Sequence, residues 1–304
     1  MPPHHSPPLP CHLARRADNE KILHESLRVA VCEVMEDTIE KRAVSSNGVT
    51  TLFADVRKTF FRMYCERYLA ECERMAARRE IKDGTAFKMM PFECSSNGLH
   101  GTFQWAKVKA RLEALRRKLL DEVDEWRTIG AQQTTMLREK RDASVNSCIH
   151  HLGQQEERIK AEAPDGASIG PNGLNSCIWE ATIFGPADTP LDGGMFGVEV
   201  VFPPEYPETP PYVRFTSAMF HPQISPAGLP YLRSLLLWHC CEPKERTIGG
   251  LLQQLVALLT TDPSPEPATH LNTEAANLYF SRSPDDHKEY KKRVKRAAQR
   301  SVDG

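Results

Sequence analysis

The sequence has 304 residues, of which 40% are hydrophobic and 26% are charged. Its 39 Lys and Arg residues nearly balance its 40 Asp and Glu residues, so the formal net charge is −1. This balance argues against a dedicated nucleic-acid binder, which needs a strongly basic surface. No apolar run approaches the ~20 residues that span a bilayer, and the N-terminus lacks the apolar core of a secretory signal. We therefore expect a soluble, cytoplasmic protein that binds neither nucleic acid nor membranes.

Nine cysteines are spaced irregularly along the chain. An odd number of cysteines without a secretion signal does not indicate a disulfide framework. We expect most of them to be small buried hydrophobic side chains, because free cysteine is among the most buried residue types.

The 23 prolines divide the chain into segments of different character. Five lie in residues 1–10, only Pro91 lies between these and Pro164, and the other 17 lie from Pro164 to Pro284. Because proline disrupts helices, the proline-poor middle of the chain is free to be helical. The predicted parts are a disordered head over residues 1–17, a helical and partly coiled-coil region over 18–147, and an α+β domain over 148–304.

Three helices are predicted in the proline-poor region, from apolar residues that recur at steps of three and four. They cover residues 19–42, residues 51–81 and a segment that begins near Gln104. The Asp83-Gly84 pair is typical of the turn that ends the second helix. That helix carries an apolar stripe of Phe53, Val56, Phe60, Met63, Tyr64 and Leu69. The third helix carries a coiled-coil-like seam of Val108, Leu112, Leu115, Leu119, Val123, Trp126 and Ile129. We expect a helical hairpin or bundle that packs on itself or on a partner helix through residues 104–142.

The C-terminal half has a different periodicity. A short helical stretch at 154–160 ends at the turn Pro164-Asp165-Gly166. Three strand-like runs follow at 177–183, 195–202 and 212–215, separated by turns rich in proline and glycine. Helical patterns return at 248–259 and from 272 to about 300. Strands in series followed by helices predict an α+β fold, with an antiparallel meander sheet and flanking helices.

An ordered series of short motifs runs through this half. It comprises Trp179 with Ile183, Gly185-Pro186-Ala187-Asp188-Thr189-Pro190 with Gly193-Gly194, Phe202-Pro203-Pro204-Glu205-Tyr206-Pro207, Pro210-Pro211-Tyr212-Val213-Arg214-Phe215, His221-Pro222, Trp238, Asp262-Pro263-Ser264-Pro265 and Asn272-Thr273-Glu274-Ala275-Ala276. The series resembles the ubiquitin-conjugating enzyme family over about residues 148–300. The resemblance implies the family's fold for this half of the chain.

The resemblance also implies a catalytic chemistry that this chain departs from. Family members carry ubiquitin as a thioester on a cysteine ten residues after the motif histidine, with a glycine three residues before the cysteine and a leucine directly after it. Counting from His221 places Gly228 and Leu232 as in the family, but the nucleophile position is Tyr231. The position of the family's asparagine, which helps to stabilise the oxyanion or to organise the neighbouring loop, is Gln223.

A tyrosine does not substitute for the cysteine in this chemistry. The relay needs a thiolate, which combines nucleophilicity near neutral pH with a good leaving group. A phenol ionises only near pH 10, and an aryl ester does not match a thioester exchange. We therefore predict a degenerate site at His221, Gln223 and Tyr231, with no catalytic residue and no cofactor.

A displaced nucleophile is the competing interpretation. Cys240 and Cys241 follow Trp238 in a loop that lies near the catalytic groove in this family, and His221 and His239 could lower the pKa of a thiol there. The alternative is that the two cysteines belong to an elongated surface loop, since relocating a nucleophile means rebuilding its surroundings. A metal site is not predicted, because these histidines and cysteines lack a paired Cys-x-x-Cys spacing.

Docking of RING-type ligases is also predicted to be weakened. In family members that bind such ligases, an aromatic residue precedes the Pro-Pro by two positions, and here that residue is Glu208. The sequence as a whole predicts a catalytically inactive binding or scaffold subunit that contacts ubiquitin, a ubiquitin-like protein or an active conjugating enzyme noncovalently. An active transferase that uses Cys240 or Cys241, and a structural subunit of a large assembly without ubiquitin contact, remain the alternatives.

Overall fold

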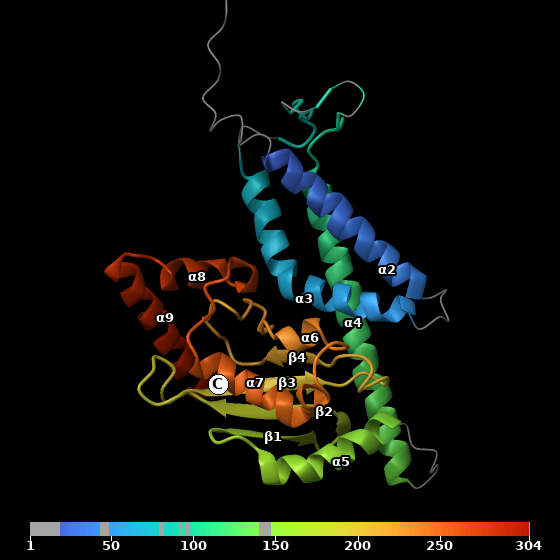
Figure 1. Cartoon of the computed structure of the whole chain (residues 1–304), viewed down its shortest axis with the longest axis vertical. Helices are drawn as coiled ribbons and strands as arrows, with labels where there is room; N and C mark the ends of the chain where they lie inside the picture. The colour runs from blue at the N-terminus through green and yellow to red at the C-terminus, as the bar shows by residue number, and fades with distance from the viewer. Residues whose placement is uncertain are drawn as a thin grey trace, which may run out of the picture. The chain divides into compact units, whose positions relative to one another are not determined.

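The computed structural model describes residues 19–42, 49–78, 82–90, 93, 94, 96, 98–139 and 147–303 (Figure 1). The predicted disordered head, residues 1–17, lies outside the described residues. The chain divides into two compact units, one within residues 1–44 and 68–116 and the other within 45–67 and 117–304. Helices α3 (Val49–Ala76) and α4 (Trp105–Arg138) each contribute residues to both units. The predicted domain boundary between residues 147 and 148 stays a prediction.

The first unit contains the predicted helix at residues 19–42. It is π-helical over η1 (Ser26–Glu33) and continues as α2 (Val34–Arg42). Its buried His24 sits among three aromatic rings, with ring-centroid distances of 5.5, 5.6 and 4.9 Å to Phe87, Phe103 and Trp105. The Nε2 atom of His24 accepts a hydrogen bond from the backbone N–H of Gln104, at 2.9 Å, so the imidazole joins α4 to this helix.

The predicted second helix differs from the observed one in its end and in its buried face. Helix α3 ends at Ala76, before the predicted Ile81. Its expected apolar stripe is wrong at two positions, because Phe53 and Phe60 are 59% and 43% exposed while Phe61 is buried. In α4 the predicted seam is buried from Val108 to Trp126, and Ile129 is half-buried. That this seam forms a coiled coil stays a prediction.

The second unit is built on a four-stranded antiparallel sheet with strand order β1-β2-β3-β4 (Figure 1). The predicted strands correspond to β2 (Asn175–Phe184), β3 (Met195–Val201) and β4 (Tyr212–Phe215). The first strand, β1 (Ala167–Asn172), is missing from the prediction, since Gly170 and Pro171 break its pattern. Alternate residues of β2 and β3 are buried, as period-two packing on one face requires.

Helices cover the sheet and complete the predicted α+β fold. The stretch predicted at 154–160 lies in α5 (Ser147–Glu162), and that at 248–259 lies in α7 (Ile248–Thr260). After the sheet come the short α6 (Arg233–Leu236), η2 (Pro243–Arg246) and η3 (Pro267–Thr269). The single helical pattern expected from 272 to 300 is two helices, α8 (Thr273–Tyr279) and α9 (Pro284–Asp303).

The break between α8 and α9 falls at Pro284, which has no N–H to continue a helix and suits the first position of a new one. Within the described ranges, none of the helices combines the length and the apolar character that crossing a membrane requires.

Candidate functional site

The segment from His221 to Leu232 follows β4 and is shaped by a tight turn at Gly228. Gly228 has a φ of +88°, and a Cβ atom there would lie 2.3 Å from the carbonyl oxygen of Phe215. The carbonyl of Gly228 accepts a hydrogen bond of 2.8 Å from the N–H of Phe215, and the N–H of Gly228 donates to Ser225. Only glycine fits this left-handed, close-packed position. The turn therefore fixes the path of the chain three residues before Tyr231.

The structure brings the three predicted site residues together. The N–H of Tyr231 donates to the carbonyl of Gln223 at 2.8 Å. The N–H of Gln223 donates to Nδ1 of His221 at 3.2 Å. Two residues eight positions apart are thus joined, and the half-buried Tyr231 lies ten positions after His221.

His221 is a neutral structural group at neutral pH. Its side chain is buried, and burial lowers the pKa of the imidazole from 6.5 to about 4. A neutral imidazole whose Nδ1 accepts a backbone hydrogen bond supplies no positive charge to stabilise a thiolate. That His221 could lower the pKa of a displaced cysteine stays a prediction.

Residues 262–272 form the loop beside this site. The carbonyl of Pro222 accepts hydrogen bonds from the N–H groups of Leu271 and Asn272, at 2.9 and 3.0 Å. The side-chain oxygen of Gln223 accepts a third, from the N–H of Ser264 at 3.1 Å. The residues around His221 and this loop therefore form one hydrogen-bonded framework.

Cys240 and Cys241 lie in a turn after α6. The N–H groups of both donate to the carbonyl of Leu237, at 2.7 and 2.9 Å. The thiol of Cys241 donates to the carbonyl of Trp238 at 3.1 Å, and burial raises the pKa of this thiol. The thiol of Cys240 is exposed to solvent. Cys241 is therefore held as a protonated thiol, whereas Cys240 is accessible.

His239, the histidine next to Cys240 in this turn, faces α3. Its Nε2 atom lies 3.9 Å from Oδ2 of the buried Asp55, and the same carboxylate oxygen accepts a hydrogen bond of 3.3 Å from the hydroxyl of Thr209. No sequence motif marks this contact. The only signal was an aspartate within a helix segment whose apolar residues predict burial.

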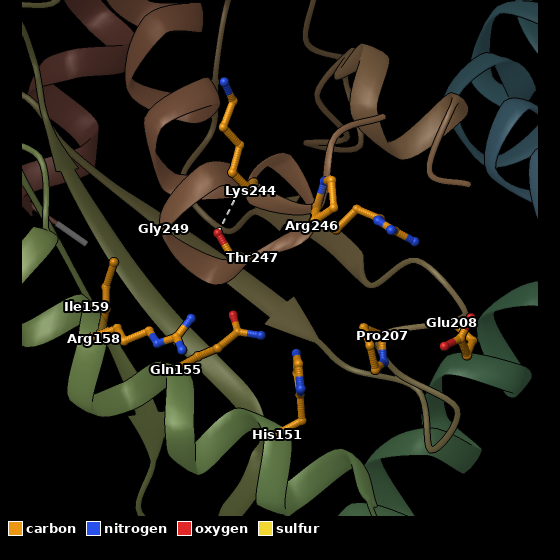
Figure 2. Close-up of a pocket in the computed structure, with 11 residues that line it drawn as sticks. His151, Gln155, Arg158, Ile159, Pro207, Glu208, Lys244, Arg246, Thr247 and Gly249 are labelled. Carbon is orange, nitrogen blue, oxygen red and sulfur yellow. Dashed lines mark hydrogen bonds between the residues drawn. The ribbon is translucent and has the colours of Figure 1, made fainter. Parts of the chain in front are cut away.

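A groove of about 480 Å³ lies on another part of the domain. Figure 2 shows α5 on one side of it, with His151, Gln155 and Arg158, and the segment with Arg246 and Thr247 on the other. Glu208 lies at its rim, beside Pro207. The residue that replaces the expected aromatic anchor for ligases thus lines an open groove, which the sequence did not reveal.

The floor of this groove is held by a buried amide. Gln155 accepts a hydrogen bond from the N–H of Ile248 at 2.7 Å and donates to the hydroxyl of Tyr206 at 3.1 Å. Tyr206 in turn donates to the carbonyl of Arg246 at 2.8 Å. These bonds join α5, the start of α7 and the loop after β3 in one place.

Comparison with known proteins identifies relatives of this domain. A family model described as "Ubiquitin-conjugating enzyme" matches residues 151–298. The chain is 38% identical over 146 residues to "Ubiquitin-conjugating enzyme E2 2" of Eremothecium gossypii, covering 48% of this chain and 79% of that protein. The protein of the same name from Saccharomyces cerevisiae is also 38% identical, with 48% and 78% covered. That from Aspergillus fumigatus is 36% identical over 155 residues, with 51% and 96% covered.

Proposed function

The chain belongs to the ubiquitin-conjugating enzyme family, and from this membership we propose that it is a noncatalytic member that acts as a binding or scaffold subunit. In this proposal it contacts ubiquitin, a ubiquitin-like protein or an active conjugating enzyme without forming a thioester. Residues 148–304 are the conjugating-enzyme-like domain and residues 18–147 the helical region. The proposed location is the cytoplasm.

One observation carries the proposal, namely that the nucleophile position is a tyrosine held in an otherwise well-formed segment. Gly228 keeps the turn before Tyr231, and the backbone of Tyr231 is bonded to Gln223. The chain around Tyr231 is thus held by a glycine turn and a backbone hydrogen bond. A phenol at this place is a poor nucleophile near neutral pH and cannot take part in thioester exchange.

The other groups near the site support the same proposal. His221 is neutral at neutral pH. The side-chain oxygen of Gln223 is engaged by Ser264, so the amide serves to hold a loop. Burial raises the pKa of the Cys241 thiol, which disfavours the thiolate form.

A displaced nucleophile is the second candidate function, and the exposure of Cys240 favours it. Cys240 is the one of the two adjacent cysteines that a thioester partner could reach. In that case the protein would be an active ubiquitin or ubiquitin-like transferase. The third candidate, a structural subunit of a large assembly, involves no ubiquitin contact.

A charging assay separates the first two candidates. The full chain is incubated with ubiquitin-activating enzyme, ATP and ubiquitin, with an active conjugating enzyme as positive control, and resolved on a nonreducing gel. We expect no adduct that a reducing agent removes. A reducible adduct that is lost in Cys240→Ala, and retained in the matched Cys94→Ala variant with another exposed cysteine, would establish the transferase and end the proposal.

A titration separates the binding subunit from the structural subunit. Isotope-labelled ubiquitin is titrated with the full chain. In a second titration, an isotope-labelled active conjugating enzyme takes the place of ubiquitin. We expect resonance changes that saturate in at least one titration. No change in either at millimolar concentration of the chain would favour the structural subunit.

A further inference from the structure

Helix α3 contacts the loop that lies beside Tyr231. The hydroxyl of Tyr64 donates a hydrogen bond to the carbonyl of Ala268. One turn further along, Nη1 of Arg67 lies 3.4 and 3.3 Å from the carbonyl oxygens of Pro267 and His270, to which it donates. Three carbonyls of the 262–272 loop are thus bonded by side chains of one helix. This loop is the same one that Gln223 and Pro222 hold from the other side.

Tyr64 is the central aromatic side chain of this contact between α3 and the loop. Tyr64 is buried, and the pKa of its phenol is raised by burial first and by the nearby Tyr231 second. The ring of Tyr64 is in turn stacked on that of Phe60, with 4.3 Å between the centroids. Aromatic side chains of α3 thus pack beside the 262–272 loop, which Ser264 joins to Gln223 in the segment of Tyr231.

The middle of this helix segment is fixed by charges on α4. Glu122 pairs with Lys58 at 2.6 Å and with Arg62 at 2.9 Å, and the side chains of Lys58 and Glu122 are 5% and 16% exposed. The guanidinium of Arg62 lies 5.4 Å from the ring centroid of Trp126 and 6.0 Å from that of Tyr212 in β4, so this part of α3 runs beside the sheet (Figure 1).

The start of the segment is fixed at the far side of the site. Asp55 accepts the hydrogen bond of Thr209 and faces His239, in the loops that precede β4 and follow α6. The contacts of this segment therefore spread over several turns of one helix, since they are made by Asp55, Arg62, Tyr64 and Arg67. A helix held at both ends and in the middle is a fixed part of this compact unit, which contains residues 45–67 together with 117–304.

We propose that residues 55–67 of α3 are a built-in cover of the degenerate site, which closes the surface around Tyr231 to an extended peptide such as the C-terminal tail of ubiquitin. The inference rests on the proposed function in taking Tyr231 as the former nucleophile position. It adds that the missing thiol is not the only obstacle to charging. A thiol placed at residue 231 is shielded until α3 moves away, and noncovalent partners bind elsewhere on the domain.

The cover is tested by the reactivity of a thiol placed beneath it. In the full-length Tyr231→Cys variant, the rate of modification at residue 231 by a bulky maleimide is followed with peptide-resolved mass spectrometry. The exposed Cys94 is the internal reference for the reagent. The same measurement is made in two further backgrounds. The first adds Tyr64→Phe and Arg67→Ala together, which removes the hydrogen bonds of α3 to the loop. The second instead adds Phe53→Ala, at an exposed position of the same helix.

Removing these hydrogen bonds should speed modification at residue 231 by about tenfold or more, while Phe53→Ala leaves the rate unchanged. Two results would overturn the cover. One is an equal rate in all three backgrounds. The other is that residue 231 of the Tyr231→Cys variant, with α3 otherwise unchanged, is modified as fast as Cys94. Circular dichroism checks that the variants stay folded. If the double change unfolds the chain, Tyr64→Phe alone is used, and a smaller acceleration is expected from it.

This readout is independent of the charging assay. If the unmodified chain were charged on Cys240, the proposed noncatalytic function would be refuted, but the difference in modification rate at residue 231 would still support the cover. Slow modification in every background, with no charging of the unmodified chain, would remove the cover and leave the noncatalytic function in place.

Discussion

The side-chain oxygen of Gln223 accepts a hydrogen bond from the backbone N–H of Ser264, at 3.1 Å. The bond crosses from the segment after β4 to the 262–272 loop, close to where Pro222 accepts two further backbone bonds from the same loop. Gln223 stands where relatives with catalytic activity are expected to have asparagine. Its amide therefore has a structural role, because it holds the 262–272 loop.

Shortening this side chain should destabilise the domain. Gln223→Ala leaves the N–H of Ser264 without its acceptor, and Gln223→Asn places the amide one methylene short, so we expect each to lower the free energy of unfolding by about 1 kcal/mol. Gln223→Glu keeps an acceptor and should cost less. Urea denaturation measures all three. Unfolding midpoints for Gln223→Ala and Gln223→Asn that match the unmodified chain would contradict the structural role.

Gly130 lies at a close approach of α4 to the sheet. A Cβ atom at this residue would lie 2.6 Å from Oδ1 of Asn175 and 2.7 Å from Cβ of Cys177 in β2. Neither neighbour can yield easily, since Asn175 also donates to the carbonyl of Arg127 at 2.7 Å. We expect Gly130→Ala to lower the free energy of unfolding by about 1–3 kcal/mol, as overpacking does.

Gly153 is the matched control for that prediction. It lies in α5, where an added Cβ meets no atom within 4 Å. Gly153→Ala should raise the free energy of unfolding by about 0.5–1 kcal/mol, because alanine favours a helix over glycine. Thermal unfolding of both variants tests the pair. A Gly130→Ala variant as stable as the unmodified chain or more stable would mean that α4 does not pack on β2 as described.

The spacing of apolar residues predicted best those helices and strands in which the spacing is most regular. The alternation in β2 and β3 and the seam of α4 are buried as expected, because one face of each packs on a core. The pattern of β1 was interrupted by glycine and proline, which suppress a strand prediction without preventing an edge strand from pairing. The stripe on α3 failed at Phe53 and Phe60, since periodicity does not reveal how wide a buried face is.

The site was predictable only as far as its spacing along the chain. Counting from His221 located Gln223 and Tyr231, and the structure joins them by backbone hydrogen bonds. The contact of Tyr64 with Ala268 spans about two hundred residues and follows no motif. Such a contact depends on how a helix packs on a distant loop, which the local pattern of neither segment encodes.

The buried imidazole of His221 should make stability depend on pH. Burial lowers its pKa to about 4 in the folded chain, against 6.5 when unfolded, so between these values the unfolded state binds more protons. The stabilising contribution is present above pH 6.5 and is lost as the pH falls toward 4. We expect this group to lower the free energy of unfolding by about 2 kcal/mol between pH 7.5 and 4.5.

His221→Asn removes the titrating group while keeping an acceptor for the N–H of Gln223. The loss of stability between pH 7.5 and 4.5, measured by urea denaturation, should therefore be smaller in this variant than in the unmodified chain. His150→Asn, at an exposed position of α5, should retain the full loss. Identical losses in all three proteins would show that the imidazole of His221 titrates alike in the folded and unfolded states.

Asp83 caps a helix that begins more than twenty residues later. Its two carboxylate oxygens accept hydrogen bonds from the N–H groups of Trp105 and Ala106, at 2.7 and 3.0 Å. These are first-turn donors of α4 that have no partner within the helix, and the negative charge also suits the positive end of the helix dipole. The Asp83-Gly84 pair thus does more than end a turn after α3.

Asp83→Ala should lower the free energy of unfolding of the full chain by about 1–2 kcal/mol, because both donors lose their acceptor. Asp83→Asn keeps one acceptor and loses the charge, so its effect should fall between. Asp121→Ala, at an exposed position within α4, should be neutral or slightly stabilising, since alanine is the better helix former. Hydrogen exchange at Trp105 and Ala106 adds a local readout: the Asp83 variants should exchange faster there, and unchanged protection at both amides would contradict the cap.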